Sequence, residues 1–176
     1  AGVNAGNSIE SGGNYNVVLG DEAGTALTTG DNNVAIGYAA LDAEDTGGNS
    51  VAIGYNALTA QNNDAANYNT AVGASAGAAI TTGVQNTIVG ALAGDALTDA
   101  DFNVAVGINA LTSDTLGSQS TAVGDNTLAA QNFTTATDTH NVAVGISAGK
   151  SITTGIRNTI IGALAGDALT DADCNV

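Results

Sequence analysis

Two short segments of the chain contain a residue type that could act as a nucleophile. Gly73-Ala-Ser75-Ala-Gly77 and Gly145-Ile-Ser147-Ala-Gly149 both match the pattern Gly-x-Ser-x-Gly. That pattern presents a catalytic serine on a strand-to-helix turn, beside a partnered histidine and an acid. The serine position belongs to a repeat, and other copies carry other residue types there: Asn4, Glu22, Asn56, Leu92 and Leu164. We therefore interpret the match as a by-product of the repeat, and the sequence predicts no catalytic residue and no enzyme.

His140 is the single histidine of the chain and Cys174 the single cysteine. In the repeat they share one position, which Tyr15, Tyr68, Phe102 and Arg157 also occupy. A position that accepts aromatic residues indicates a rim side chain, and without a Cys/His cluster we expect no zinc site. A lone cysteine excludes an internal disulfide, and pairing across a chain interface is the alternative for Cys174.

Clustered carboxylates provide the other candidate ligands. Three aspartates in one Asp-Ala-Leu-Thr-Asp-Ala-Asp segment recur in a second copy: Asp95, Asp99, Asp101, Asp167, Asp171 and Asp173. Oxygen-rich loops suit Ca²⁺. Neither the EF-hand spacing nor the nonapeptide of calcium-binding β-rolls is present, so the alternative is solvated turn charges. Weak calcium binding is the one metal hypothesis that the sequence supports, and we expect no other cofactor.

Charge and composition exclude several classes of partner. Acidic residues outnumber basic ones 17 to 2, which gives a formal net charge of −15. Such a surface repels phosphate groups, so we expect neither nucleic-acid binding nor binding to anionic membranes. The hydrophobic content of 44% is too high for a disordered acidic tail, and no apolar run is long enough to span a membrane.

The whole chain consists of about ten copies of a unit near 17 residues long. Each copy has a glycine after a short apolar run, here called the marker glycine: Gly20, Gly37, Gly54, Gly73, Gly90, Gly107, Gly124, Gly145 and Gly162, with Gly2 heading a more degenerate copy. Aliphatic or threonine residues stand one and three positions before it, which is a strand pattern. A unit this short leaves no room for a crossover helix. The sequence therefore predicts an all-β fold, a parallel β-solenoid in which each copy forms one coil.

The strand pattern also predicts which side chains face inward. We expect the Val, Ile and Thr positions to line the interior, on one face of the strands. The opposite face is a strip of alanines, which could be a second buried layer or a seam between chains: Ala35, Ala52, Ala71, Ala105, Ala122 and Ala143.

Two further positions vary together. The residue four positions after the marker glycine is Gly or Leu. Where it is Gly, the residue seven positions after the marker glycine is Ile or Leu; where it is Leu, that residue is polar. Each coil thus supplies one bulky aliphatic side chain, as a core of constant cross-section requires. The two coil types alternate in pairs, which makes a single solenoid array over residues 1–176 with four-coil super-repeats at 2–72 and 73–144 and a partial one at 145–176.

An asparagine stands four residues before most marker glycines: Asn33, Asn69, Asn86, Asn103, Asn141 and Asn158. Stacked amides of this kind can form a hydrogen-bonded ladder that braces the turns. Paired threonines, such as Thr28-Thr29 and Thr81-Thr82, suggest an ice-binding face, although Asn62 and Phe133 are among the residues that interrupt the pairs.

The run Asn-Ser-Val-Ala-Ile-Gly at 49–54 and the run Asn-Thr-Ala-Val-Gly at 69–73 resemble the head repeats of trimeric autotransporter adhesins. Tyr55-Asn-Ala-Leu58 continues like similar repeats in phage tail fibres and bacterial surface fibre proteins. The resemblance implies a parallel β-roll, often trimeric, that is displayed outside the cell and used for attachment. The coils here are about three residues longer than the usual adhesin repeat.

From these observations we expect a non-enzymatic, extracellular or cell-surface structural protein, a segment of a self-assembling fibre or adhesin. Its expected partner is itself, by end-to-end stacking into a filament or as a homotrimer, and a host or surface receptor is a further candidate. Since no capping segment is recognisable, we expect a piece of a longer array or ends that stack on neighbours. The alternative is a binding module, either a receptor-binding region of a phage tail fibre or an ice-binding solenoid.

Overall fold

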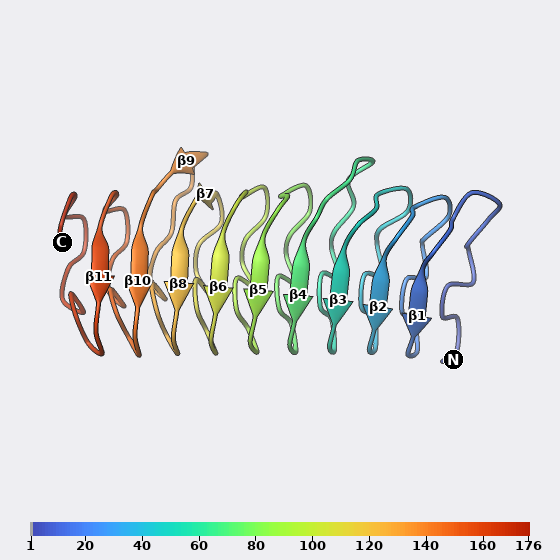
Figure 1. The fold of residues 1–176 in the computed structure, drawn as a ribbon, viewed down its shortest axis with the longest axis horizontal. Coiled ribbons are helices and arrows are strands. Elements are labelled where there is room, and N and C mark those ends of the chain that lie inside the picture. The colour runs from blue at the N-terminus through green and yellow to red at the C-terminus, as the bar shows by residue number, and fades with distance from the viewer. Residues whose placement is uncertain (1) are drawn as a thin grey trace.

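The computed structural model describes residues 2–176 as a single rod of stacked coils (Figure 1). Nine three-residue strands, one per coil, form a parallel sheet along the rod: β1 (Val17–Leu19), β2 (Val34–Ile36), β3 (Val51–Ile53), β4 (Thr70–Val72), β5 (Thr87–Val89), β6 (Val104–Val106), β8 (Thr121–Val123), β10 (Val142–Val144) and β11 (Thr159–Ile161). Each strand pairs only with its neighbours in sequence order. The predicted parallel β-solenoid with a repeat near 17 residues is confirmed.

The described residues contain no helix, and hence none that could cross a membrane. The degenerate copy after Gly2 forms turns and no strand, but it still stacks on the next coil, because the Gly6 amide donates to the Ala23 carbonyl at 2.9 Å.

The marker glycines align along one edge of the sheet, directly after the strands. Their φ angles lie between 129° and 141° from Gly20 to Gly162, a region that residues with a Cβ rarely adopt. The coils also approach closely here, since a Cβ on Gly37 would lie 2.5 Å from the Gly54 carbonyl oxygen. Both the backbone conformation and the tight stacking therefore require glycine.

The prediction for the two faces of the strands is wrong. The alanine strip lies inside, and all six of its members are fully buried: Ala35, Ala52, Ala71, Ala105, Ala122 and Ala143. The Val, Ile and Thr side chains on either side of each alanine point outward and are partly or fully exposed. The alanines are therefore a buried layer and not available as a seam between chains. The physical reason is the narrow coil, which has room for only a methyl group opposite the bulky residues of the returning chain.

The core contains one bulky aliphatic residue per coil at the positions that vary together. Leu41, Leu58, Leu111 and Leu128 fill it in coils of one type, and Leu27, Ile80, Leu97 and Ile152 fill it in the other. The glycine of the second type is required, because a Cβ on Gly94 would lie 2.8 Å from Leu97 Cδ1. The predicted exchange between the two positions is confirmed.

Some coils use a third source of bulk, at a position of the alanine strip that the sequence predicts to be enlarged by Ile88 and Ile160. Ile88 and Ile160 replace alanine at the inward position of β5 and β11 and are buried, at 0% and 6% exposure. In both cases the facing position is glycine, since Gly94 and Gly166 lie against these isoleucine side chains.

Two coils depart from the regular outline at the edge from which the strands begin (Figure 1). These excursions are the segments 62–66 and 132–138, which belong to the two longest coils, of 19 and 21 residues. The second contains β9 (Thr137–Asp138), which pairs in parallel with β7 (Gly117–Ser118). The first forms a single bridge between Gly48 and Ala66.

Candidate functional site

The two Gly-x-Ser-x-Gly segments form turns between coils. Ser75 has a φ of 55° and Ser147 a φ of 56°, and their amides donate to carbonyls of the preceding coil, those of Tyr55 and Asp125. No helix follows either serine. The single histidine, His140, is exposed at the other end of the strand, before β10. The structure therefore does not bring a serine, a histidine and an acid together at either segment.

The six candidate calcium ligands also remain apart. Residues 2–176 contain no group of three or more acidic, histidine or cysteine side chains that could hold a metal ion. Several of these carboxylates instead join neighbouring coils: Asp101 accepts from the Val84 amide at 2.8 Å, and Asp173 accepts from the Ile156 amide at 2.8 Å. The weak calcium hypothesis thus finds no convergent ligand set in the described chain.

The asparagine column is buried, but its hydrogen bonds differ from a simple amide ladder. Asn86 shows the pattern: its Nδ2 donates to the Ala100 carbonyl at 2.8 Å, and its Oδ1 accepts from the Asn103 amide at 2.9 Å. Each side chain therefore connects its own coil to the backbone of the next one. Direct bonds between amide side chains are fewer, as between Asn158 and Asn141 at 3.3 Å.

The paired threonines have the same bracing role. Thr28, Thr81 and Thr153 each donate a hydroxyl hydrogen bond to a carbonyl of the next coil, at 3.1, 3.3 and 3.2 Å. Thr82 donates to the Asp99 carboxylate at 2.6 Å. These four hydroxyls are therefore engaged in hydrogen bonds between neighbouring coils.

Two buried polar clusters lie beneath the excursions. In the first, Glu44 is completely buried and accepts from the Gly47 amide at 2.8 Å, from Gln61 Nε2 at 2.9 Å and from Asn67 Nδ2 at 2.9 Å. Burial raises the pKa of the Glu44 carboxyl above its ordinary value, although the hydrogen bond from Gln61 opposes the shift.

The second cluster repeats this arrangement one super-repeat later. Asp114, also completely buried, accepts from Gln131 Nε2 at 2.5 Å and from the amides of Gly117 at 3.1 Å and Phe133 at 3.0 Å. Each carboxylate therefore holds the start of the excursion in the following coil. The sequence does show a polar residue, seven positions after the marker glycine, where the other coil type has Leu or Ile. That pattern indicates that the leucine of the same coil supplies the apolar bulk, and it does not by itself predict a buried carboxylate.

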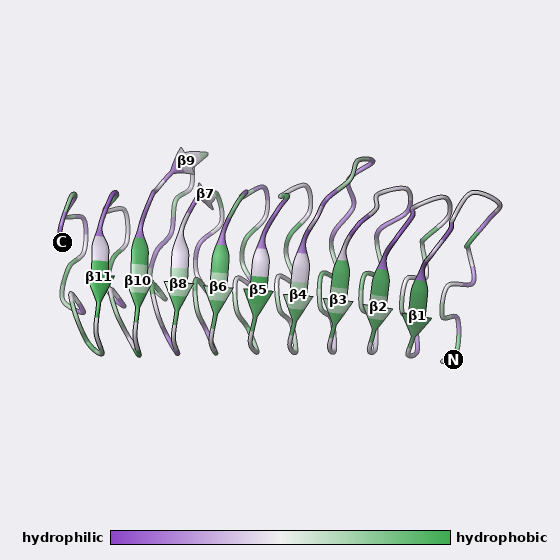
Figure 2. Ribbon diagram, viewed as in Figure 1, coloured by the Kyte–Doolittle hydropathy of each residue, from purple (hydrophilic) through white to green (hydrophobic). Residues whose placement is uncertain are grey.

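The outward side of the sheet, here called the outer face, is a mostly apolar surface that is partly exposed in most coils and most exposed towards its two ends. It consists of the residues one and three positions before the marker glycines: Val17, Leu19, Val34, Ile36, Val51, Ile53, Thr70, Val72, Thr87, Val89, Val104, Val106, Thr121, Val123, Val142, Val144, Thr159 and Ile161. Figure 2 shows β1, β2, β3, β6 and β10 mostly in hydrophobic green, whereas β4, β5, β8 and β11, which begin with threonine, are pale at that end. None of these residues is charged, on a chain with a formal net charge of −15.

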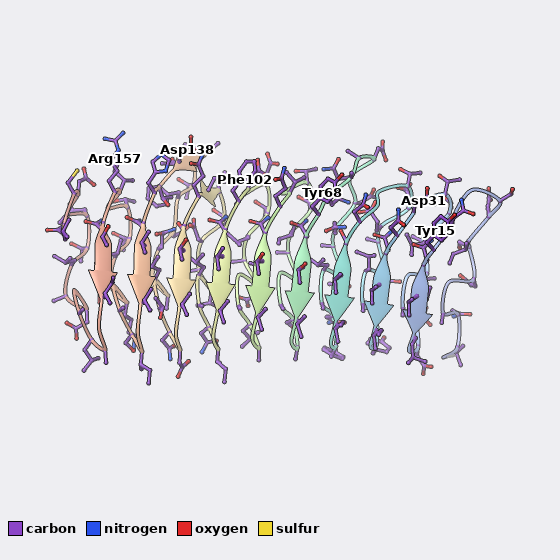
Figure 3. The ribbon with its side chains drawn as sticks, in the orientation of Figure 1. Tyr15, Asp31, Tyr68, Phe102, Asp138 and Arg157 are labelled. Carbon is purple, nitrogen blue, oxygen red and sulfur yellow. The ribbon has the colours of Figure 1, made fainter. Side chains whose placement is uncertain are left out.

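A second series, here called the edge column, stands five residues before the marker glycines and is exposed except at Asn49 and Gln119, which are half-buried. It contains Tyr15, Asn32, Asn49, Tyr68, Gln85, Phe102, Gln119, His140, Arg157 and Cys174, all with positive φ. The labelled members Tyr15, Tyr68, Phe102 and Arg157 lie along one edge of the rod in Figure 3. The prediction that His140 and Cys174 are rim side chains agrees with their exposure.

A depression lies beside β11, where Ile160, Leu169 and Val176 are among its lining residues. It continues the core at this end of the stack. The candidate sites are therefore the outer face and the edge column of a β-solenoid repeat protein. No protein-family model matches this sequence, and comparisons with curated proteins and with solved structures find no similar protein.

Proposed function

We propose that this protein is a non-enzymatic structural protein, a segment of an extracellular or cell-surface fibre, whose copies associate through the outer face. The observation that carries the proposal is the chemical uniformity of that face. The resemblance to adhesin head repeats and fibre repeats supports the same role, as does the absence of charge on a face of an otherwise acidic rod.

The repeats within the chain allow one position to be compared with another. The residue before the marker glycine is Leu, Ile or Val in all nine strands. Other outward positions vary freely, and the edge column alone includes Tyr, Asn, Gln, Phe, His, Arg and Cys. β-Propensity would accept threonine or tyrosine at an exposed strand position. A position that stays aliphatic in every coil, although it points outward, indicates a surface that is covered in the assembled state.

The area of the outer face shows what an interface between copies needs. Nine strands at about 4.8 Å spacing and three residues wide give roughly 40 Å by 10 Å, on the order of 400 Å² per copy. A stable interface buries about 800 Å² per partner. The closed homotrimer that the resemblance implies therefore also needs exposed apolar side chains just beyond the strands, which include Tyr38, Tyr55, Ile108 and Ile146.

The oligomeric state tests the proposal. Light scattering on purified protein is expected to give three times the chain mass of 17.0 kDa. The double variant Ile53→Lys/Val106→Lys, which places charges on the outer face, is expected to be monomeric. The matched control Gln85→Lys/Gln119→Lys adds the same charges to the edge column and is expected to keep the wild-type mass.

Electron microscopy of the same samples separates lateral association from end-to-end stacking. Lateral association predicts short particles of the length of one rod, and stacking predicts long filaments whose formation is insensitive to Ile53→Lys/Val106→Lys. A wild-type protein that stays monomeric at tens of micromolar would refute the self-association proposal.

A second function is favoured by the threonines of the outer face. Thr70, Thr87 and Thr121 present hydroxyl and methyl groups on neighbouring or nearby strands of one sheet, at a regular strand spacing. A flat, uncharged and regular surface of this kind is the arrangement that an ice-binding solenoid needs. Thermal hysteresis of a micromolar solution tests this function, and no hysteresis in the monomeric or assembled protein would rule it out.

A further inference from the structure

We propose that the edge column binds an extended, uncharged carbohydrate chain that lies along the rod. This inference does not depend on self-association, because the edge column and the outer face are separate surfaces. It goes beyond a structural role, since it assigns a ligand class to a surface that the fold does not need.

The first support is the exposure of large aromatic side chains. Tyr15 is 84% exposed, Tyr68 58% and Phe102 49%. All three point away from the rod along one edge (Figure 3). Aromatic residues normally contribute to stability through the large apolar area that they bury. At this exposure they contribute little of it, so their presence calls for a partner outside the molecule.

The second support is the backbone conformation at these positions. Tyr15, Tyr68 and Phe102 have φ angles of 59°, 54° and 59°. The left-handed region costs a residue with a bulky side chain about 1–2 kcal/mol, whereas asparagine tolerates it. The same column has Asn32 at a φ of 59° in an otherwise equivalent turn. The turn imposes this conformation in every coil, so an aromatic residue in place of asparagine is a choice that the fold does not require.

The left-handed leucines of this chain are of two kinds. Leu58 has a φ of 49°, and its completely buried side chain fills the core, so burial offsets the strain. Leu92 and Leu164 have similar φ angles and are 43% and 61% exposed, as the aromatic residues of the edge column are. Exposed left-handed residues therefore occur elsewhere, and the edge column differs from them by its rings.

The third support is the order of residues along the edge. Six consecutive coils carry Tyr68, Gln85, Phe102, Gln119, His140 and Arg157. Rings at Tyr68, Phe102 and His140 thus recur every second coil, at roughly 10 Å, with an amide side chain between them. This spacing is comparable to the length of a disaccharide unit in an extended chain. Rings can stack on the apolar faces of alternate sugars while the glutamine amides hydrogen-bond to hydroxyl groups between them.

The two excursions place further polar groups on the same edge. Tyr68 follows the excursion at 62–66 and His140 follows the one at 132–138 (Figure 1). Their exposed side chains are small, amide, hydroxyl or carboxylate groups, among them Asp64, Thr135 and Asp138. Carboxylates accept hydrogen bonds from sugar hydroxyls, and threonine hydroxyls both donate and accept them. The buried side chains of Glu44 and Asp114 hold both excursions in place from below.

Charge restricts the class of ligand. The net charge of −15 disfavours sulfated or uronic glycans and nucleic acids, although aromatic side chains could stack on bases. An uncharged glycan meets no such repulsion. Several weak contacts along one chain also add up, because each bound sugar unit raises the effective concentration of the next.

The test is an array of uncharged oligosaccharides of four or more sugar units, including β-1,4-glucan, chitin, mannan and galactan fragments. The wild-type protein is expected to bind at least one of them, with affinity that increases with chain length. The variant Tyr68→Asn/Phe102→Asn is expected to lose at least tenfold in affinity for that ligand. Because asparagine suits a left-handed turn, this variant keeps its fold, which circular dichroism and light scattering verify.

The matched control is Leu92→Asn/Leu164→Asn. These leucines are also exposed, at 43% and 61%, and have left-handed φ angles of 56° and 59°, but they follow the strands and belong neither to the edge column nor to the outer face. The control is expected to retain binding. No binding to any uncharged oligosaccharide on the array, or equal loss in the control and in Tyr68→Asn/Phe102→Asn, would overturn the proposal while leaving self-association untouched.

Discussion

Adjacent residues of β5 give a sharp test of which side of the strands is the interior. Ile88 points inward and is completely buried, whereas Val89 points outward and is partly exposed. We expect Ile88→Ala to destabilise the solenoid strongly and Val89→Ala to have a small effect in the monomer. An interior lined by the Val and Ile positions next to the marker glycines would give the opposite order.

The magnitude follows from the carbon atoms removed. Ile88→Ala removes three buried carbons at about 0.8 kcal/mol each, roughly 2.4 kcal/mol in transfer free energy. Ile88 fills the space over Gly94, since its Cδ1 would lie only 3.1 Å from a Cβ built on that glycine. Removing the Ile88 side chain therefore leaves a cavity between coils that Gly94 has no side chain to fill. The cavity contribution raises the expected loss to about 3–4 kcal/mol. Val89→Ala removes two carbons from a surface in contact with solvent, and we expect less than about 1 kcal/mol.

The assay is urea unfolding at low protein concentration, combined with amide hydrogen exchange. In a repeat protein each coil contacts only its neighbours, so the loss is expected as faster exchange in the coils around β5 before global unfolding. The inward placement of the alanine strip would be refuted by an Ile88→Ala loss below about 1 kcal/mol together with a larger loss for Val89→Ala.

Three further predictions test the coil contacts. Gly107→Ala is expected to lower the unfolding free energy by about 3 kcal/mol or more. The new Cβ would collide with the Gly124 backbone, and the φ of Gly107 is 136°. The melting temperature is expected to fall markedly, and an unchanged value would contradict the close stacking. Asn86→Ala is expected to lower the unfolding free energy, measured in urea, by about 2–4 kcal/mol. It leaves the backbone amide of Asn103 and the carbonyl of Ala100 without their side-chain partner. A neutral effect would mean that these hydrogen bonds do not stabilise the stack. The folded state raises the pKa of Glu44, so it holds the carboxyl proton more firmly than the unfolded chain does. The contribution of Glu44 to the unfolding free energy therefore decreases as pH rises from the ordinary value of 4.5 through the folded pKa. The unfolding free energy of the wild type minus that of Glu44→Gln, measured against pH, is expected to show this decline, and a flat difference would refute it.

Much of the candidate-site chemistry could be judged from the sequence, because the repeats provide internal comparisons. The serine of Gly-x-Ser-x-Gly shares its position with leucine and asparagine, and His140 shares its position with Tyr68 and Phe102. The structure places these residues in turns and along a rim, as that comparison indicated. The buried carboxylates were not recognised, because nothing in a single sequence shows that Glu44 and Asp114 find amide partners in the following coil.

The sequence by itself determined the coil length, the strand positions, the register and the exchange of bulk between glycine and leucine positions. These features are periodic, and a period of 17 residues with β-branched residues at every second position allows few other stacked arrangements. Only the tertiary structure decided which face of the strands is the interior. Alternation along a strand shows which side chains share a face, but the direction in which the chain turns at the marker glycines selects the inner one. In this coil the space inside is narrow enough that alanine at positions such as Ala105 fits there, and the larger Val106 points outward.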